Sequence, residues 1–173
     1  LHNNPLVSPT TVHGLWIKNM MKNDFDVESI DFAIEKSISD LGIVPIKELP
    51  RKEKLRGKLK CYENGTIVVV PGKHNIEFFL LALSEFDENN RAHSSKDNII
   101  KCVERLLEFY DVNGQGYPMY VPLMGTGRSR AGLTHYNSLQ IMKSVFSLHN
   151  EKVHGVINIV IYQNDKDKVS IFD

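Results

Sequence analysis

The stretch that most constrains the fold is residues 119–132, where an apolar run passes directly into a glycine-rich loop. The loop holds Gly125, Gly127 and Gly132 together with two arginines and two hydroxyl side chains. Glycine lets backbone N–H groups approach an anion without a Cβ in the way, and arginine offers forked donors to phosphate oxygens. Thr134 then opens a predicted helix, whose N-terminus carries a partial positive charge. The pattern predicts a phosphate-binding loop between a strand and a helix.

Two common phosphate-binding motifs do not fit this loop. Arg130 stands where a dinucleotide-binding fingerprint has its third glycine, and no acidic partner follows at the usual distance. The Gly-Lys-Ser/Thr of nucleoside triphosphatases is also missing. A plain strand-to-helix turn is the alternative, although such a turn needs neither two arginines nor three glycines.

Composition limits the classes of partner. A chain of 173 residues is long enough for one domain with a proper core. Its 21 basic and 21 acidic residues cancel, so no global field gathers nucleic acid or anionic lipid, and any anion site must be local. Cys61 and Cys102 stand alone, which predicts reduced thiols and a cytoplasmic domain; a disulfide between them is left open.

Hydrophobic periodicity predicts an α/β protein. Apolar residues at helical spacing favour helices at residues 12–21, 29–41, 96–110 and 134–148. Strands are expected at residues 65–70, 76–83 and 156–162 and from Met119, with a short edge strand at 168–172. The runs at 65–70 and 76–83, separated by a turn at 71–75, are apolar throughout and predict strands buried on both faces. Helices interleaved with such strands imply a sheet covered on both sides.

Three further segments have alternative interpretations. His13-Gly14 is either the turn that begins a helix or a second ligand loop. Residues 84–93 follow a predicted strand and form either a ligand loop or a polar surface loop. The basic segment 45–60 is a solvated connection or a docking site for a partner, and contains Lys47, Arg51, Lys52, Lys54, Arg56, Lys58 and Lys60.

The residue patterns of common catalytic sites are missing from the sequence. The seven histidines lack the spacing of metal ligands, so no metal is expected. There is no G-x-S-x-G motif, and nothing close in sequence marks a base for Ser129. Glu85 and Asp87 are paired carboxylates only as loop neighbours. The sequence therefore favours a binding protein over an enzyme.

Several of these motifs together resemble a known family. The segment 122–127, Pro-Leu-Met-Gly-Thr-Gly, is similar to the second phosphate loop of macro domains, which bind ADP-ribose. With residues 8–14, 82–90 and 156–161 it resembles the divergent macro domain of Thoeris antiphage effectors, of the type that carries transmembrane helices ahead of the macro domain. The resemblance spans nearly all of residues 1–173 and implies a single macro-type domain, a three-layer α/β/α sandwich with a mixed central sheet.

The resemblance also implies a function. A partner TIR-domain enzyme consumes NAD and releases a diffusible ADP-ribose-derived signal, of the histidine–ADP-ribose type, and the macro domain binds it to activate a membrane effector. The domain itself would be a cytoplasmic, non-catalytic sensor, the C-terminal part of a longer protein anchored in the bacterial inner membrane. No cofactor and no nucleic acid are implied, and ligand-driven assembly of a homo-oligomer is left open.

Carried over residue by residue, the resemblance assigns ligand contacts to four segments. The first segment is expected to contact one phosphate, and the second to form the rim of the pocket. The third segment is expected to wrap the diphosphate and the distal ribose, and the fourth to stack on adenine. The residues are Thr11, Val12, His13 and Gly14; Ser84, Glu85, Phe86, Asp87 and Asn90; Leu123, Gly125, Thr126, Gly127, Arg128, Ser129, Arg130, Ala131 and Gly132; and Tyr162.

The sequence departs from hydrolytic macro domains in two ways, of which the first bears on activity and the second on the extent of the domain. Their Asn-Ala-Ala-Asn and glycine-triplet segment is missing, and no apolar first strand precedes Asn3. The first departure favours the sensor over the alternative, a macro-type hydrolase of ADP-ribosyl adducts in which His13 or a loop carboxylate positions water. The second predicts that residues of the domain lie upstream of this chain. A third alternative is an interaction scaffold that uses the basic segment.

Overall fold

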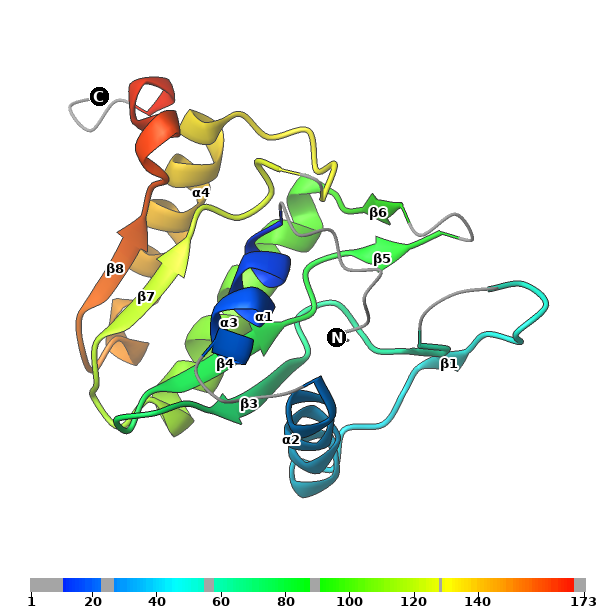
Figure 1. Cartoon of the computed structure of the whole chain (residues 1–173). Helices are drawn as coiled ribbons and strands as arrows, with labels where there is room; N and C mark the ends of the chain where they lie inside the picture. The colour runs from blue at the N-terminus through cyan, green and yellow to red at the C-terminus, as the bar shows by residue number, and fades with distance from the viewer. Residues whose placement is uncertain (1–10, 23–26, 55–57, 88–90, 128, 170–173) are drawn as a thin grey trace. The chain divides into compact units, whose positions relative to one another are not determined.

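The structure is a computed structural model that describes residues 11–22, 27–54, 58–87, 91–127 and 129–169 (Figure 1). Its contacts divide the chain into two compact units, and each is described by itself. The first comprises Leu1–Ala82 with Phe86–Arg91, and the second comprises Leu83–Glu85 with Ala92–Asp173.

The first unit contains two helices and an antiparallel strand pair. Helices α1 (Val12–Lys22) and α2 (Val27–Asp40) confirm the two helices predicted here. Strands β3 (Ile67–Pro71) and β4 (Glu77–Leu81) pair antiparallel, with Val69 opposite Phe79. The turn between them places His74 and Asn75 at positive φ, a conformation that asparagine tolerates better than most residues.

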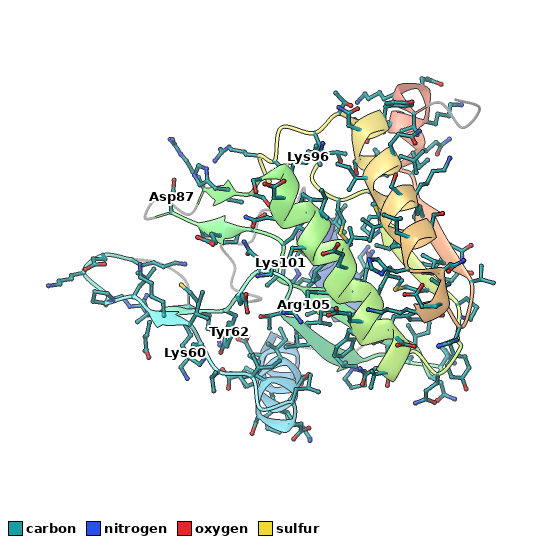
Figure 2. The ribbon with its side chains drawn as sticks, turned by 180° about the vertical axis from the view of Figure 1, so that it is seen from behind. Lys60, Tyr62, Asp87, Lys96, Lys101 and Arg105 are labelled. Carbon is teal, nitrogen blue, oxygen red and sulfur yellow. The ribbon has the colours of Figure 1, made fainter. Side chains whose placement is uncertain are left out.

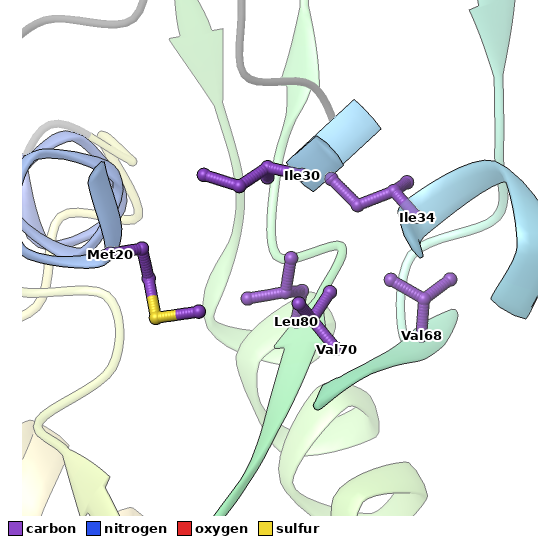
Figure 3. Packing of buried hydrophobic residues seen from close by; sticks show 6 residues of the cluster. All are labelled: Met20, Ile30, Ile34, Val68, Val70 and Leu80. Carbon is purple, nitrogen blue, oxygen red and sulfur yellow. The ribbon is translucent and has the colours of Figure 1, made fainter. Parts of the chain in front are cut away.

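The core of this unit lies where α1 and α2 contribute apolar side chains beside the strand pair. Ile30 and Ile34 are one helical turn apart on α2, so both point to the same side of the helix. Together with Met20, Val68, Val70 and Leu80 they form the buried cluster seen in Figure 3. Ser37 is a buried polar residue of α2 whose Oγ accepts a hydrogen bond of 2.8 Å from Val69 N, so a side chain of the helix satisfies a backbone donor of the strand.

The basic segment is more structured than the expected solvated connection. Strands β1 (Lys47–Glu48) and β2 (Lys60–Cys61) pair antiparallel, and Lys58 Nζ lies 3.0 Å from Glu35 and 3.5 Å from Asp31. Burial works against the charge of Lys58, but these two carboxylates outweigh it and raise the pKa of Lys58. Lys54 is 5% exposed, with Nζ 5.9 Å from the centre of the Phe86 ring.

The second unit is built on two capped helices and a parallel strand pair. Helix α3 (Lys96–Asn113) begins at Ser95, whose Oγ accepts from Asn98 N, and α4 (His135–Leu148) begins at Thr134, whose Oγ1 accepts from Asn137 N. Strands β7 (Met119–Pro122) and β8 (Ile157–Val160) run parallel in the register Met119 to Ile157. The second unit also contains β6 (Ala92–His93) and the 3₁₀ turns η1 (Asn150–Lys152) and η2 (Gln163–Lys168), while β5 (Glu85–Phe86) has one residue in each unit.

Some fold predictions are confirmed and others are wrong. All four helices and a mixed α/β composition are confirmed. Strand β3 is buried on both faces as predicted, but β4 buries only Leu80. The predicted edge strand at 168–172 is wrong at Lys168, which ends η2, and residues 170–173 lie outside the described part. The described strands pair two by two, so a single central sheet between helix layers stays a prediction, as does a single domain.

Two chemical features accompany this architecture. Cys61 and Cys102 are both free thiols, the first half-buried and the second buried. Within the described ranges, no helix combines the length and the apolar character needed to span a bilayer.

Candidate functional site

The parallel strand pair of the second unit brings two predicted ligand segments to one edge. Strands β7 and β8 end side by side, because Pro122 pairs with Val160 (Figure 1). The glycine-rich loop follows β7, and Tyr162 follows β8 by two residues. Tyr162 is 66% exposed, as a side chain that stacks on a ligand must be. In open α/β proteins, ligands bind at this carboxyl edge.

The base of the glycine-rich loop is fixed from two sides. The buried hydroxyl of Ser138 on α4 donates a hydrogen bond of 2.6 Å to Met124 O. Gly125 has φ +83°, and a Cβ built there would lie 2.9 Å from Leu133 Cδ1 and 3.0 Å from Ile99 Cγ1. Both the backbone conformation and the packing therefore require glycine at position 125.

The tip of the loop is open, in contrast to its base. A Cβ built on Gly127 would meet nothing within 4 Å, and the φ of Gly127 is outside the left-handed range. The same space is open beside Gly132, although its φ of +71° still favours glycine. Arg130 N donates to Gly127 O at 3.4 Å and holds Arg130 at φ +53°. The described part of the chain therefore leaves the space beside the Gly127 Cα open.

Arg130 connects this loop to the segments that begin α3. Its Nη1 lies 3.5 Å from Ala92 O, a long hydrogen bond that uses one of five guanidinium donors. Ser94 Oγ in turn donates to Leu83 O at 3.1 Å, which places Ser84 and Glu85 beside the start of the helix. Figure 2 shows Lys96 at the first turn of α3, with Lys101 and Arg105 further along. Arg128, the other arginine of the loop, lies outside the described residues.

Ser129 has an unusual polar environment. Its Oγ is buried and has no hydrogen-bond partner. Buried polar atoms are almost always paired, so an unpaired hydroxyl within a predicted ligand loop marks a donor or acceptor that a ligand can satisfy.

Polar contacts between Asp165, His135 and Lys168, called the Asp165 triad, join the segment after Tyr162 to α4. Asp165 lies 3.3 Å from His135 Nε2 and 2.6 Å from Lys168 Nζ. The hydrogen bond from Lys168 is the main reason that the pKa of Asp165 is lowered, and His135 adds to it. Because Asp165 N also donates to Tyr162 O, this triad positions Tyr162 at the edge.

The predicted residues at the start of the first unit lie in a helical turn. Thr11 caps α1, with Oγ1 accepting from Gly14 N at 3.1 Å, and Val12, His13 and Gly14 form the first turn. The helix-start interpretation of His13-Gly14 is therefore correct for the backbone, and a ligand would meet the helix N-terminus there rather than a separate loop. The ring of His13 stacks on Trp16 at 5.6 Å and 26°.

The predicted rim residues in the first unit are partly engaged by the protein. Asp87 Oδ1 accepts from Arg91 N at 2.8 Å, while Asp87 N donates to Arg91 O. The exposed ring of Phe86 carries Lys54 Nζ near one face. Asn90 lies outside the described residues.

Sequence analysis missed several residues that shape these segments. Ser138 was detectable in principle, because it is a polar residue on the apolar stripe of α4. Lys54 belongs to a charged run and gave no sign of burial, and Trp16 reads as an ordinary core aromatic. The Ala92 carbonyl that receives Arg130 carries no signal in the sequence.

The polar groups of these segments are suited to hydrogen bonding. Among the described residues, no three His, Cys, Asp or Glu side chains are grouped closely enough to hold a metal ion. Exposed loop backbone, the donors of Arg130 and the hydroxyl of Ser129 suit an anion with several acceptor oxygens.

Comparison with known proteins gives a consistent result. A family model described as Thoeris protein ThsA, Macro domain, matches residues 1–162. The Thoeris protein ThsA of Bacillus amyloliquefaciens (strain Y2) is 23% identical over 176 residues, which cover 96% of this chain and 54% of that protein. The chain spans about half the length of this curated relative.

Proposed function

Because the chain belongs to the macro domain family of the Thoeris protein ThsA, we propose that it is a non-catalytic receptor for an ADP-ribose-derived signal in antiphage defence. The signal is of the histidine–ADP-ribose type and reaches the receptor by diffusion from a TIR-domain enzyme that consumes NAD. The receptor acts in the cytoplasm and, through the rest of the protein, activates an effector in the bacterial inner membrane.

The observation that supports this proposal most is the backbone at Gly127. Neither packing nor a left-handed φ accounts for glycine at this position, unlike Gly125. A glycine that the fold does not require is expected where a ligand approaches the main chain closely. The diphosphate of ADP-ribose is such a ligand, since its oxygens accept hydrogen bonds from backbone N–H groups.

The charges near the loop support an anion of limited size. The chain as a whole is neutral, so long-range attraction cannot gather a polyanion such as nucleic acid. Arg130 supplies one local cation, and the hydrogen bond from its Nη1 to Ala92 O orients the guanidinium group. One or two such cations match a diphosphate rather than a polymer.

The proposal includes the sheet and the assembly that a macro-type receptor would have. We propose that the domain is a three-layer α/β/α sandwich with a mixed central sheet, a fold to which the observed antiparallel pair β3–β4 and parallel pair β7–β8 each conform in strand direction. Ligand-driven assembly of a homo-oligomer is part of the same proposal. Sedimentation with and without saturating ligand tests the assembly.

A ligand comparison by isothermal titration calorimetry tests the function directly. The ligands are ADP-ribose, its cyclic forms, NAD and histidine–ADP-ribose, and the conjugate is expected to bind most tightly. At about 100 times its Kd, a ligand specific for the folded state should stabilise the protein by about 2.7 kcal/mol in a parallel thermal melt. If none of these ligands binds, the receptor proposal is wrong.

Chromatography of the same mixtures separates the receptor from the alternative hydrolase of ADP-ribosyl adducts. The receptor returns the conjugate intact after prolonged incubation. Release of ADP-ribose at a rate proportional to protein concentration would show turnover, and would replace the receptor by the hydrolase.

A further inference from the structure

Two buried side-chain polar atoms in the described part of the chain have no hydrogen-bond partner, and both lie in or beside predicted ligand segments. They are Ser129 Oγ in the glycine-rich loop and Trp16 Nε1 in α1. Buried donors are almost always paired in native proteins, because an unpaired donor has lost its hydrogen bonds to water without gaining any in the protein. Ser129 already belongs to the proposed ligand site. Trp16 has no assigned role.

The surroundings of Trp16 are aromatic. Its ring lies 5.6 Å from the His13 ring at 26°, and 5.6 Å from the Phe78 ring at 65°. The residue is partly buried and packs beside the apolar cluster that contains Met20 and Leu80. His13 itself is one of the predicted ligand contacts, one helical turn before Trp16.

This environment limits the chemistry of any group that pairs with the indole. The indole nitrogen can only donate, so its partner must be an acceptor. Bringing a charged phosphate among apolar rings would cost much of its hydration, whereas a flat uncharged ring stacks on aromatic side chains. A neutral heteroaromatic ring with an acceptor nitrogen fits both requirements.

We propose that Trp16 contacts the bound signal and that its Nε1 donates a hydrogen bond to a ring nitrogen of that signal. The inference rests on the proposed function and adds a specificity-determining residue to it. An ADP-ribose conjugate offers the required chemistry in two places, the adenine and the imidazole of an attached histidine. Both rings are flat and both carry an acceptor nitrogen.

The fluorescence of the wild-type protein provides the first test, because Trp16 is the one tryptophan in the sequence. Saturating histidine–ADP-ribose should change the emission of Trp16, with the same Kd as calorimetry. A change with ADP-ribose as well assigns the contact to adenine, and a change with the conjugate alone assigns it to the attached ring. Ribose 5-phosphate, which has no ring base, should leave the emission unchanged.

The variant Trp16→Phe provides the second test, since it keeps an aromatic ring and removes the donor. Affinity should fall about tenfold, as expected for one lost hydrogen bond. The melting temperature should change little, because the packing that the smaller ring loses beside the apolar cluster is offset by the removal of a buried unpaired N–H. Tyr120→Phe removes a polar atom from an exposed aromatic residue and should change neither quantity.

Three results would overturn the inference. The first is emission that stays constant while calorimetry shows binding. The second is a folded Trp16→Phe variant with wild-type affinity, which would show that the indole N–H does not contact the ligand. In the third, no ligand binds the wild type by calorimetry, so the proposed function fails and the inference with it.

Discussion

At the scale of single residues, Gly125 and Gly127 occupy one loop for different reasons. Gly125 → Ala places a Cβ against Leu133 and Ile99 and forces a left-handed φ on alanine. We expect a loss of about 1–3 kcal/mol in the free energy of unfolding. Urea denaturation measures this loss. A variant as stable as the wild type would show that the packing at Gly125 is looser than the distances indicate.

Gly127→Val is the matched change at the tip of the loop. The Cβ of the new side chain meets nothing within 4 Å, so stability should stay within about 0.5 kcal/mol of the wild type. The added carbons occupy the space through which a ligand reaches the backbone, so affinity for the ADP-ribose conjugate should fall by more than about tenfold. Isothermal titration calorimetry measures the affinity of the variant and of the wild type. Unchanged affinity in a stable Gly127→Val protein would remove the principal support for a ligand at this loop.

At the scale of elements, Ser138 shows how a helix fixes the loop. Ser138→Ala removes the donor to Met124 O and leaves a buried carbonyl unpaired, which should cost about 1–3 kcal/mol of stability. The exposed Ser144 on the same helix is the control, and Ser144→Ala should have little effect. If urea denaturation gives the two variants equal stability, the bond to Met124 does not stabilise the loop.

The stability of the folded protein should depend on pH through Asp165, whose main partner is Lys168 in the same 3₁₀ turn, η2. Its pKa is lowered from 3.8 in the folded protein, so the ion pair stabilises the fold above about pH 4 and is lost as pH falls through the lower folded value. Asp165→Asn should therefore be less stable than the wild type at pH 6, with a difference that shrinks toward zero in acid. Thermal melts from pH 6 to pH 3 measure it, and a constant difference would contradict the assignment.

The helices and strands were largely predictable from sequence, but the side-chain hydrogen bonds between segments distant in sequence were not. The helices follow from apolar spacing within a single turn or two, as with Ile30 and Ile34, and capping residues such as Thr134 mark where they begin. Ser138 reaches a carbonyl 14 residues away, and Arg130 reaches one 38 residues away. Contacts at such separations depend on the assembled fold. The burial of Lys54 within the basic segment was not predictable for the same reason, since Phe86 lies far from Lys54 in sequence.

At the scale of the whole molecule, the predicted ligand contacts are divided between the two units. Thr11, His13 and Gly14 belong to the first unit, whereas Gly127, Ser129 and Tyr162 belong to the second. Each unit can therefore be tested for ligand contacts by itself. A unit that the ligand contacts should open less often, since it can open at the contact only after the ligand leaves.

Hydrogen exchange followed by mass spectrometry tests the predicted contacts of each unit separately. Saturating conjugate should slow exchange in peptides that cover residues 11–16 and in peptides that cover 123–134. The β3–β4 pair, which contains no predicted contact, should gain protection only through global stabilisation, and so provides the reference within the same sample. Protection confined to 123–134 would place the whole ligand on the second unit, and would remove both α1 and Trp16 from the site.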